Sequence, residues 1–187
     1  AFHSIVPGSV MEFYESVGVP RSVGSRPEAS HYALRSLLST RWLFDYDNSD
    51  NMQYAKSEDK YFEYAGSTKM PGWTYADKQN GFFIYENQYY IPMGFTYDYY
   101  ITEEEYEATV KNTRSNLLMR ALVLSEEDAA VYGKYLKKLP EEKRNDLWYD
   151  TYVSDCADRR ASACRVFQMT NSGFHAEIDL GKEDLVF

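Results

Sequence analysis

Cysteine and histidine are scarce in this sequence, and their scarcity argues against several kinds of site. The 187 residues include two cysteines and three histidines. Cys156 and Cys164 do not form a CxxC pair, so a zinc site built on thiolates is not expected, and we expect no metal and no cofactor. The two cysteines are compatible either with one disulfide or with two buried free thiols.

Long apolar runs and catalytic motifs are also missing. The best apolar run, Leu117–Leu124, is interrupted by Arg120 and is far shorter than the ~20 residues that a membrane-spanning helix needs. The sequence contains no GxSxG nucleophile motif and no glycine-rich phosphate loop of the GxGxxG or GxxxxGK type. We therefore expect a soluble domain without catalytic residues of its own.

Basic residues are outnumbered by acidic ones. Lys and Arg number 20 against 29 Asp and Glu, which gives a formal net charge of −9. Because nucleic acids attract proteins chiefly through Lys and Arg, we expect no nucleic-acid partner.

Aromatic residues, by contrast, are abundant. The chain has 18 Tyr, 10 Phe and 3 Trp, and its mean hydropathy is nevertheless −0.58. Such rings can fill a core, or they can form a sugar-binding surface, because Tyr and Trp faces stack on the C–H faces of sugar rings. With 44% hydrophobic residues, the composition is that of one globular domain spanning residues 1–187.

The order of local patterns predicts an α+β fold with a mixed or antiparallel sheet and a helical block between two β regions. Residues 1–60 are expected to form two helices, a strand and an exposed polar loop that begins at residue 45. Residues 61–101 are expected to be rich in β-structure, residues 102–163 to be helical, and residues 164–187 to form a C-terminal β-hairpin. We expect this hairpin region to continue past Phe187 in a longer protein.

Short motifs carry these expectations. Ser9–Glu12 and Thr102–Glu105 both have the Ser/Thr-x-x-Glu spacing of a helix capping box. Asn80-Gly81 has the composition of a two-residue hairpin turn. The alternation of apolar and polar residues along Tyr89–Tyr99 predicts a strand. A helix that begins at Pro140 is expected to turn Trp148 inward.

Two groups of polar residues are candidates for ligand binding. His31 and Arg35 lie one helical turn apart, and they could face one anion together with Arg41, or pair with the chain's surplus acids. The second set combines polar side chains that bind hydroxyls with aromatic rings that stack on sugars. It consists of Glu86, Asn87, Tyr89, Tyr97 and Asp98. Alternatively, Arg35 and Glu86 form a buried ion pair that holds a helix against a strand.

Near the C-terminus, His175, Glu177 and Asp179 share one face of the expected hairpin. These residue types can bind a metal ion, but the same pattern is typical of a strand face that is exposed to solvent. We favour the exposed strand face.

Three segments together are similar to a known family. They are Phe13–Pro27; His31–Phe44, with Leu-Arg-Ser-Leu-Leu-Ser-x-Arg-aromatic-Leu; and Asn80–Tyr100, with Ile-Tyr-Glu-Asn followed by Ile-Pro-Met-Gly-Phe. In this order they resemble the large extracytoplasmic domain of the YfhO family of bacterial multi-pass membrane proteins. The resemblance is good up to about residue 120 and weaker in the later helices and the C-terminal segment.

The resemblance implies a place and a function. The YfhO family is similar to glycosyltransferases of the GT-C class, which move a sugar from a polyprenyl-phosphate carrier to a cell-envelope acceptor, such as (lipo)teichoic acid in Gram-positive bacteria. It implies that the chain lies on the extracytoplasmic face of the cell membrane, with the membrane-embedded remainder of its parent protein as partner. The catalytic acid of that class lies on an early extracytoplasmic loop that has no counterpart here.

On this interpretation the domain positions substrate or covers the membrane active site, and it is not catalytic alone. The substrate would be a polyprenyl-phosphate sugar or a cell-wall glycan. The substrate-binding candidates are His31, Arg35, Arg41, Glu86, Asn87, Tyr89, Tyr97 and Asp98. Two alternatives stay open, a free-standing glycan-binding module and a structural or partner-docking domain.

Overall fold

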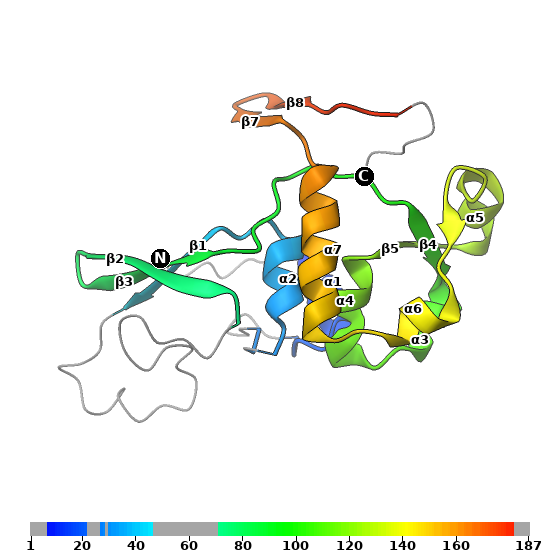
Figure 1. Cartoon of the computed structure of the whole chain (residues 1–187), viewed down its shortest axis with the longest axis horizontal. Coiled ribbons are helices and arrows are strands. Elements are labelled where there is room, and N and C mark those ends of the chain that lie inside the picture. The colour runs from blue at the N-terminus through cyan, green and yellow to red at the C-terminus, as the bar shows by residue number, and fades with distance from the viewer. Residues whose placement is uncertain (1–6, 22–26, 29, 47–70, 182–187) are drawn as a thin grey trace.

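Helix α7 (Tyr149–Ala161) runs through the middle of the molecule, with a small sheet on either side and a hairpin beyond its C-terminal end (Figure 1). The computed structural model describes residues 7–21, 27–28, 30–46 and 71–181. Within these residues helices and strands are combined, and the strands form three small sheets, which confirms the predicted α+β fold. Most of the predicted polar loop and the first part of the predicted β-rich segment lie outside the described residues.

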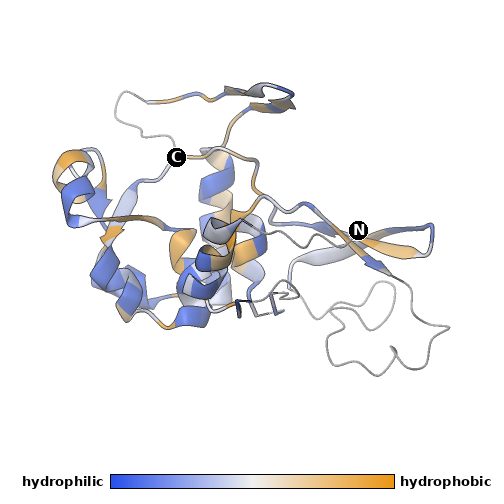
Figure 2. Cartoon of the chain, turned by 180° about the vertical axis from the view of Figure 1, so that it is seen from behind, coloured by the Kyte–Doolittle hydropathy of each residue, from blue (hydrophilic) through white to orange (hydrophobic). Residues whose placement is uncertain are grey.

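The first sheet is antiparallel and has the strand order β1-β3-β2, with β1 at Trp42–Tyr46, β2 at Trp73–Gln79 and β3 at Phe82–Asn87. Asn80 and Gly81 join β2 to β3 with φ angles of 50° and 77°, which confirms the predicted hairpin turn. Figure 2 shows the apolar residues of β3 near the tip of this sheet. The sheet lies at one end of the molecule (Figure 1).

The register of this sheet determines which side chains share a face. Trp42 pairs with Glu86 and Phe44 pairs with Ile84, so these four side chains lie on one face. The opposite face carries a small core in which Trp73 and Tyr85 are buried. The face with Trp42 is the more exposed of the two at its edge strand, where both Trp42 and Phe44 are exposed.

The N-terminal helices are short. They are α1 (Gly8–Ser16) and α2 (Tyr32–Leu37), which pack together around Val17, Val19 and Leu34. The predicted capping box at Ser9 is wrong, because the backbone N–H groups of Val10 and Met11 already bond to the Pro7 carbonyl and the helix begins before Ser9.

The second sheet is parallel and has the strand order β5-β4-β6, with β4 at Tyr99–Thr102, β5 at Ala121–Leu124 and β6 at Lys137–Lys138. Residues 102–163 are therefore not the purely helical block that the sequence predicts. A helical crossover joins β4 to β5, as parallel strands require. It consists of α3 (Glu103–Ala108), the 3₁₀ helix η1 (Lys111–Thr113) and α4 (Arg114–Leu118). Helix α5 (Glu126–Tyr132) follows β5, and helix α6 (Glu141–Asn145) follows β6.

The segment of residues 89–98, predicted as a strand, is irregular up to β4. It includes an isolated bridge between Phe95 and Ala163. Pro92 has no N–H to donate to a ladder, and Gly94 has a φ angle of 72° that breaks the extended backbone. The alternation in the sequence instead reflects side chains that point into the core, among them Ile91 and Tyr97.

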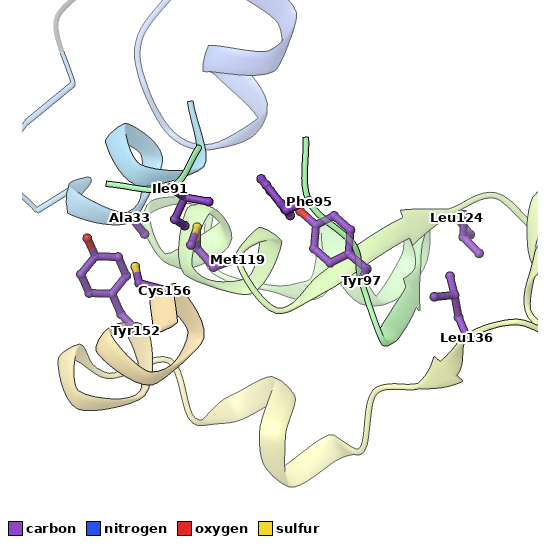
Figure 3. Packing of buried hydrophobic residues seen from close by; sticks show 9 residues of the cluster. All are labelled: Ala33, Ile91, Phe95, Tyr97, Met119, Leu124, Leu136, Tyr152 and Cys156. Carbon is purple, nitrogen blue, oxygen red and sulfur yellow. The ribbon is translucent and has the colours of Figure 1, made fainter. Parts of the chain in front are cut away.

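The main core forms where this irregular segment meets α2, α4 and α7 (Figure 3). Ile91 and Phe95 pack near Met119 at the end of α4, and Tyr152 and Cys156 come from α7. Both Cys156 and Cys164 are buried free thiols, which resolves the alternative that the sequence left open.

Buried arginines connect the irregular segments to the helices. Arg114 donates hydrogen bonds to the backbone carbonyls of Ser16 (2.9 Å), Thr109 (3.0 Å) and Glu107 (2.6 Å). Arg159 of α7 donates to the Thr96 carbonyl in the same manner. Buried carbonyls at the ends of helices and in irregular chain need hydrogen-bond donors, and these guanidinium groups supply them.

The C-terminal hairpin is present as predicted, with β7 at Val166–Thr170 and β8 at Gly173–Glu177. Phe167 and Phe174 stack with ring centroids 5.3 Å apart, and Met169 lies on the same face. On the other face His175 and Glu177 are within 3.2 Å of each other. The hairpin projects beyond the end of α7 (Figure 1), and Met169 and Phe174 are exposed.

Candidate functional site

The predicted ligand-binding residues do not converge on one site, and the first pair, His31 and Arg35, is buried. Arg35 donates to the carbonyls of Pro27 (2.7 Å), Glu28 (3.1 Å) and His31 (3.3 Å). It therefore fixes the chain ahead of α2, and it does not face an anion together with His31 as the sequence suggests. The predicted Arg35–Glu86 pair is also wrong, since Glu86 pairs with Arg41.

His31 is the N-cap residue of α2, and its side chain is 4% exposed. Neither ring nitrogen has a hydrogen-bond partner in the described part of the chain. Burial lowers the pKa of His31 below its ordinary value, Glu28 and the nearby Val17 backbone oppose this effect, and Arg35 adds to it. The imidazole is thus held in its neutral form inside the fold.

This burial predicts a loss of stability in mild acid. Below pH 6.5 the unfolded chain binds a proton at His31 that the folded chain resists, so the free energy of unfolding should fall as the pH drops from 6.5 toward the folded pKa. The slope is at most about 1.4 kcal/mol per pH unit. Urea unfolding at pH 7.5, 6.0 and 5.0 measures it. The His31→Leu variant should lose this slope, whereas His175→Gln on the exposed hairpin should retain it.

Asn87 is buried and Tyr89 is half-buried, and both pack against the interior. The Asn87 amide donates to Ser36 Oγ (3.2 Å) and to the Thr40 carbonyl (3.0 Å), and its Oδ1 accepts from the Tyr89 backbone N–H (2.9 Å). The Tyr89 ring packs against the tyrosines of α7, 5.5 Å from the Tyr152 ring. These two predicted binding residues therefore hold β3 and its following turn against the helices.

Tyr97 and Asp98 both contact Arg159. The guanidinium carbon of Arg159 lies 5.2 Å from the Tyr97 ring centroid, and its Nη2 is 3.3 Å from Asp98 Oδ2. Tyr97 donates to the Leu118 carbonyl at 2.6 Å, and burial raises the pKa of its hydroxyl well above the ordinary value. Asp98 lines a small polar pocket of about 230 Å³ together with Arg120 and Asp155, whose side chains pair with each other.

Arg41 and Glu86 are the predicted residues that the structure brings together at the surface. Arg41 Nε and Nη2 lie 3.1 and 3.0 Å from Glu86 Oε1. The same guanidinium lies 5.2 Å from the Trp42 ring centroid and 5.7 Å from that of Tyr90. Trp42 and Glu86 are neighbours in the register of β1 and β3, which explains why residues far apart in sequence meet here. These four residues are called the Arg41 surface below.

A larger pocket, of about 720 Å³, lies between α3 and η1 on one side and β6, α6 and the start of α7 on the other. Its lining includes Glu104, Glu105, Lys138, Arg144 and Trp148. The sequence prediction placed Trp148 on the inward face of one helix, which is wrong. The backbone leaves the helical conformation at Asp146 (φ −91°, ψ 74°), so α6 ends there and Trp148 becomes the exposed N-cap residue of α7.

One feature of the sequence could have predicted that Trp148 is exposed in this pocket. Pro140 and Trp148 are eight positions apart, and Asn145-Asp146 between them has the composition of a helix stop. A helix interrupted there exposes the indole, as the structure shows.

The Cys156 thiol on α7 is buried and has low reactivity. Burial raises the pKa of the Cys156 thiol to about 11, so it is protonated at neutral pH and is a poor nucleophile. No group of three or more His, Cys, Asp or Glu side chains among the described residues is placed to hold a metal ion. In the same part of the chain no helix has both the length and the apolar composition needed to cross a bilayer.

Comparison of the chain with protein-family models, with curated proteins and with solved structures finds no match. The resemblance to the YfhO family therefore stays a prediction, and any function must be argued from the geometry of the chain itself.

Proposed function

We propose that this chain is a non-catalytic domain that binds and positions a glycan, as part of a YfhO-like membrane glycosyltransferase on the extracytoplasmic face of a bacterial cell. The parent protein would move a sugar from a polyprenyl-phosphate carrier to an acceptor such as (lipo)teichoic acid. The membrane-embedded remainder of that protein would be the partner of this domain and would hold the reactive centre.

The Arg41 surface is the observation that carries this proposal. It places an exposed indole, a phenol ring, a guanidinium and a carboxylate within one small area. A sugar ring can stack its C–H face on Trp42, because aromatic faces offer apolar area with a polarised edge. Its hydroxyls can then donate to Glu86 and accept from Arg41, whose guanidinium has more N–H donors than the Glu86 pair uses.

The pairing of Arg41 with Glu86 also fixes the geometry before any ligand arrives. Two guanidinium nitrogens bond to one carboxylate oxygen, and two rings lie close to the same cation. Side chains that are already ordered lose less conformational entropy when they bind a ligand. The surface is therefore suited to weak, oriented binding of the kind that a positioning domain needs.

Glycan binding through this surface predicts a defined mutational pattern. Titration of the chain with teichoic-acid fragments and with neutral oligosaccharides, followed by calorimetry, should give millimolar or tighter binding. Trp42→Ala should weaken it at least about tenfold, which is about 1.4 kcal/mol. Tyr132→Ala on α5 is the matched control, since Tyr132 is 42% exposed and Trp42 is 41% exposed. Equal affinity of the Trp42→Ala and Tyr132→Ala variants would contradict the proposed site.

The same surface can be tested in the parent protein. Arg41→Ala and Glu86→Gln should reduce sugar transfer in cells while the domain stays folded, because neither side chain is part of the core. Unchanged transfer with both variants would leave the pair a structural feature of β1 and β3.

Docking onto a protein partner is a second candidate function, and the C-terminal hairpin favours it. Its face with Phe167, Met169 and Phe174 is apolar, and Met169 and Phe174 are exposed. Exposed apolar area of this kind is often a contact surface. If no glycan binds, Met169→Asp and Phe174→Asp in the parent protein distinguish this candidate, because they should lower its activity without unfolding the domain.

A further inference from the structure

The 720 Å³ pocket beside α3 contains none of the eight residues predicted from the sequence to bind substrate. It lies by α3 and α6, at the other end of the molecule from the sheet that carries the Arg41 surface (Figure 1). Its volume is within the range of about 300–1,000 Å³ that small-ligand pockets occupy. The pocket is thus large enough for one or more sugar rings and is separate from the surface described above.

One wall of the pocket is apolar and unusually exposed. Trp148 is 74% exposed and Val110 is 70% exposed, although both line the same pocket. The backbone of Trp148 is fixed, since its carbonyl accepts hydrogen bonds from the Tyr152 N–H (3.0 Å) and from Thr151 Oγ1 (2.8 Å) in the first turn of α7. The indole therefore stands on a rigid base with its ring available to a ligand.

The other wall is charged and internally ordered. Glu105 lines the pocket, and its Oε2 accepts from the Thr102 backbone N–H (3.0 Å) in the capping box that the sequence predicts. Lys138 Nζ lies 3.1 Å from Glu105 Oε1, and Arg144 bonds to the same atom. These contacts lower the pKa of Glu105, although desolvation by burial opposes them, so the carboxylate stays ionised and keeps both cations in place.

The charges of this wall indicate which chemistry it recognises. Glu104 and Glu105 balance Lys138 and Arg144, so the lining has no net charge to attract an ion. It does offer acceptors on Glu104, donors on Lys138 and Arg144, and both on the side-chain amide of Asn145. Such an alternation of donors and acceptors beside an exposed indole suits a neutral ring that carries many hydroxyl groups.

We propose that this pocket is a second glycan subsite, which binds a neutral sugar unit with its C–H face on Trp148 and its hydroxyls on Glu104, Lys138 and Arg144. The inference rests on the proposed function for its ligand class, but it concerns different residues. A chain with two such subsites, one at each end, would hold an extended glycan at two points along its length.

The three tryptophans provide the test. Trp42 reports the Arg41 surface, Trp148 reports the pocket, and Trp73, which is 4% exposed, is an internal control. A ¹⁵N–¹H spectrum of the indole N–H groups is recorded while maltotriose, cellotriose and chitotriose are added in turn. The Trp148 signal should shift and saturate with at least one of these neutral trisaccharides, and the Trp73 signal should not move. Glucose 6-phosphate at the same concentration should shift Trp148 less than the neutral sugars do.

Two variants connect the shift to the pocket. Glu104→Gln removes a charge from an exposed side chain and should weaken the sugar-dependent shift of Trp148 about fivefold while the fold is kept. Glu127→Gln on α5 is the matched control and should leave the affinity unchanged. If Glu104→Gln and Glu127→Gln titrate alike, the polar wall does not bind the sugar and the proposal is overturned.

The outcomes for this pocket and for the proposed function are separable. If no trisaccharide moves Trp148 while glycan binding shifts Trp42, the second subsite is overturned and the proposed function stands. If Trp148 shifts and Trp42 does not, the pocket binds sugar and the Arg41 surface is overturned. If neither signal moves with any glycan, both proposals are overturned.

Discussion

Arg120→Ala is expected to lower the free energy of unfolding by about 3–5 kcal/mol, because it leaves a buried carboxylate without its partner. Arg120 Nε lies 3.1 Å from both carboxylate oxygens of Asp155, and Nη2 lies 2.7 Å from Oδ2. The two side chains are 10% and 12% exposed. The same guanidinium donates to the carbonyls of Lys143 in α6 and of Asp146 just after it (2.9 Å), so the substitution also removes donors at the C-terminal end of α6.

Urea unfolding at pH 7, followed by circular dichroism, measures this loss. Arg160→Ala is the control, because the exposed Arg160 also donates to two carbonyls, those of Gln88 and Tyr90, without a buried carboxylate. It should cost about 1–2 kcal/mol. The double variant with Arg120→Met and Asp155→Leu should be more stable than Arg120→Ala alone, since it removes both charges. A loss below about 1 kcal/mol for Arg120→Ala would show that Asp155 is hydrated in spite of its burial.

Arg120 is one example of how this fold compensates for its short elements. The second sheet has strands of two to four residues, and the chain between β3 and β4 is irregular. Arg35, Arg114 and Arg159 each donate to at least one carbonyl outside the helices and strands, and all three are buried. In this domain, buried arginines satisfy backbone carbonyls that longer β-ladders would satisfy in other folds. For that reason these arginines are unavailable for ligand binding.

The parts of the fold that the sequence predicted are those set by local chemistry. Thr102 caps α3 as expected, with its hydroxyl accepting from the Glu105 N–H. Asn80-Gly81 forms its turn because few other residue pairs adopt two positive φ angles. At Ser9 the same capping pattern failed, because Pro7 fixes φ near −53° and starts the helix earlier.

The parts that could not be predicted depend on long-range packing. Ala121–Leu124 is too short to be distinguished as a strand or a helix by its pattern, and its pairing with β4 decides the matter. Residues 89–98 alternate between apolar and polar as a strand would. Their buried side chains, however, pack against helices α2, α4 and α7 and are not part of a sheet.

The candidate site shows the same division. Arg41 and Glu86 meet because β1 pairs with β3, a long-range pairing that the Asn80-Gly81 turn between β2 and β3 does not itself predict. His31, Arg35 and Asn87 are polar like Arg41 and Glu86, but they are buried. Their burial depends on long-range contacts that cannot be identified from the sequence. The pocket at Trp148 was missed because its exposure arises from a break between two helices at Asp146.

Tyr152→Ala is expected to be about as damaging as Arg120→Ala, for a different reason. The Tyr152 ring lies 4.7 Å from the Tyr32 ring, 5.5 Å from Tyr89 and 5.8 Å from Tyr149, measured between centroids. Removing a buried aromatic ring leaves a cavity in a close-packed cluster and typically costs about 3–5 kcal/mol. Its hydroxyl lies 2.8 Å from Ser36 Oγ, and burial raises the pKa of Tyr152 well above the ordinary value.

The contribution of the ring is separated from that of the hydroxyl by Tyr152→Phe. This variant keeps the packing and removes one hydrogen bond, but the Asn87 amide still donates to Ser36 Oγ at 3.2 Å. It should cost about 1 kcal/mol. Tyr132→Ala on the exposed face of α5 should change the free energy of unfolding by less than about 0.5 kcal/mol. Urea unfolding of the three variants should therefore rank them Tyr152→Ala, Tyr152→Phe, Tyr132→Ala in order of decreasing loss. If Tyr152→Ala cost no more than Tyr152→Phe, the tyrosine cluster around α7 would not be the close-packed centre on which the positions of β3, α2 and the Arg41 surface depend.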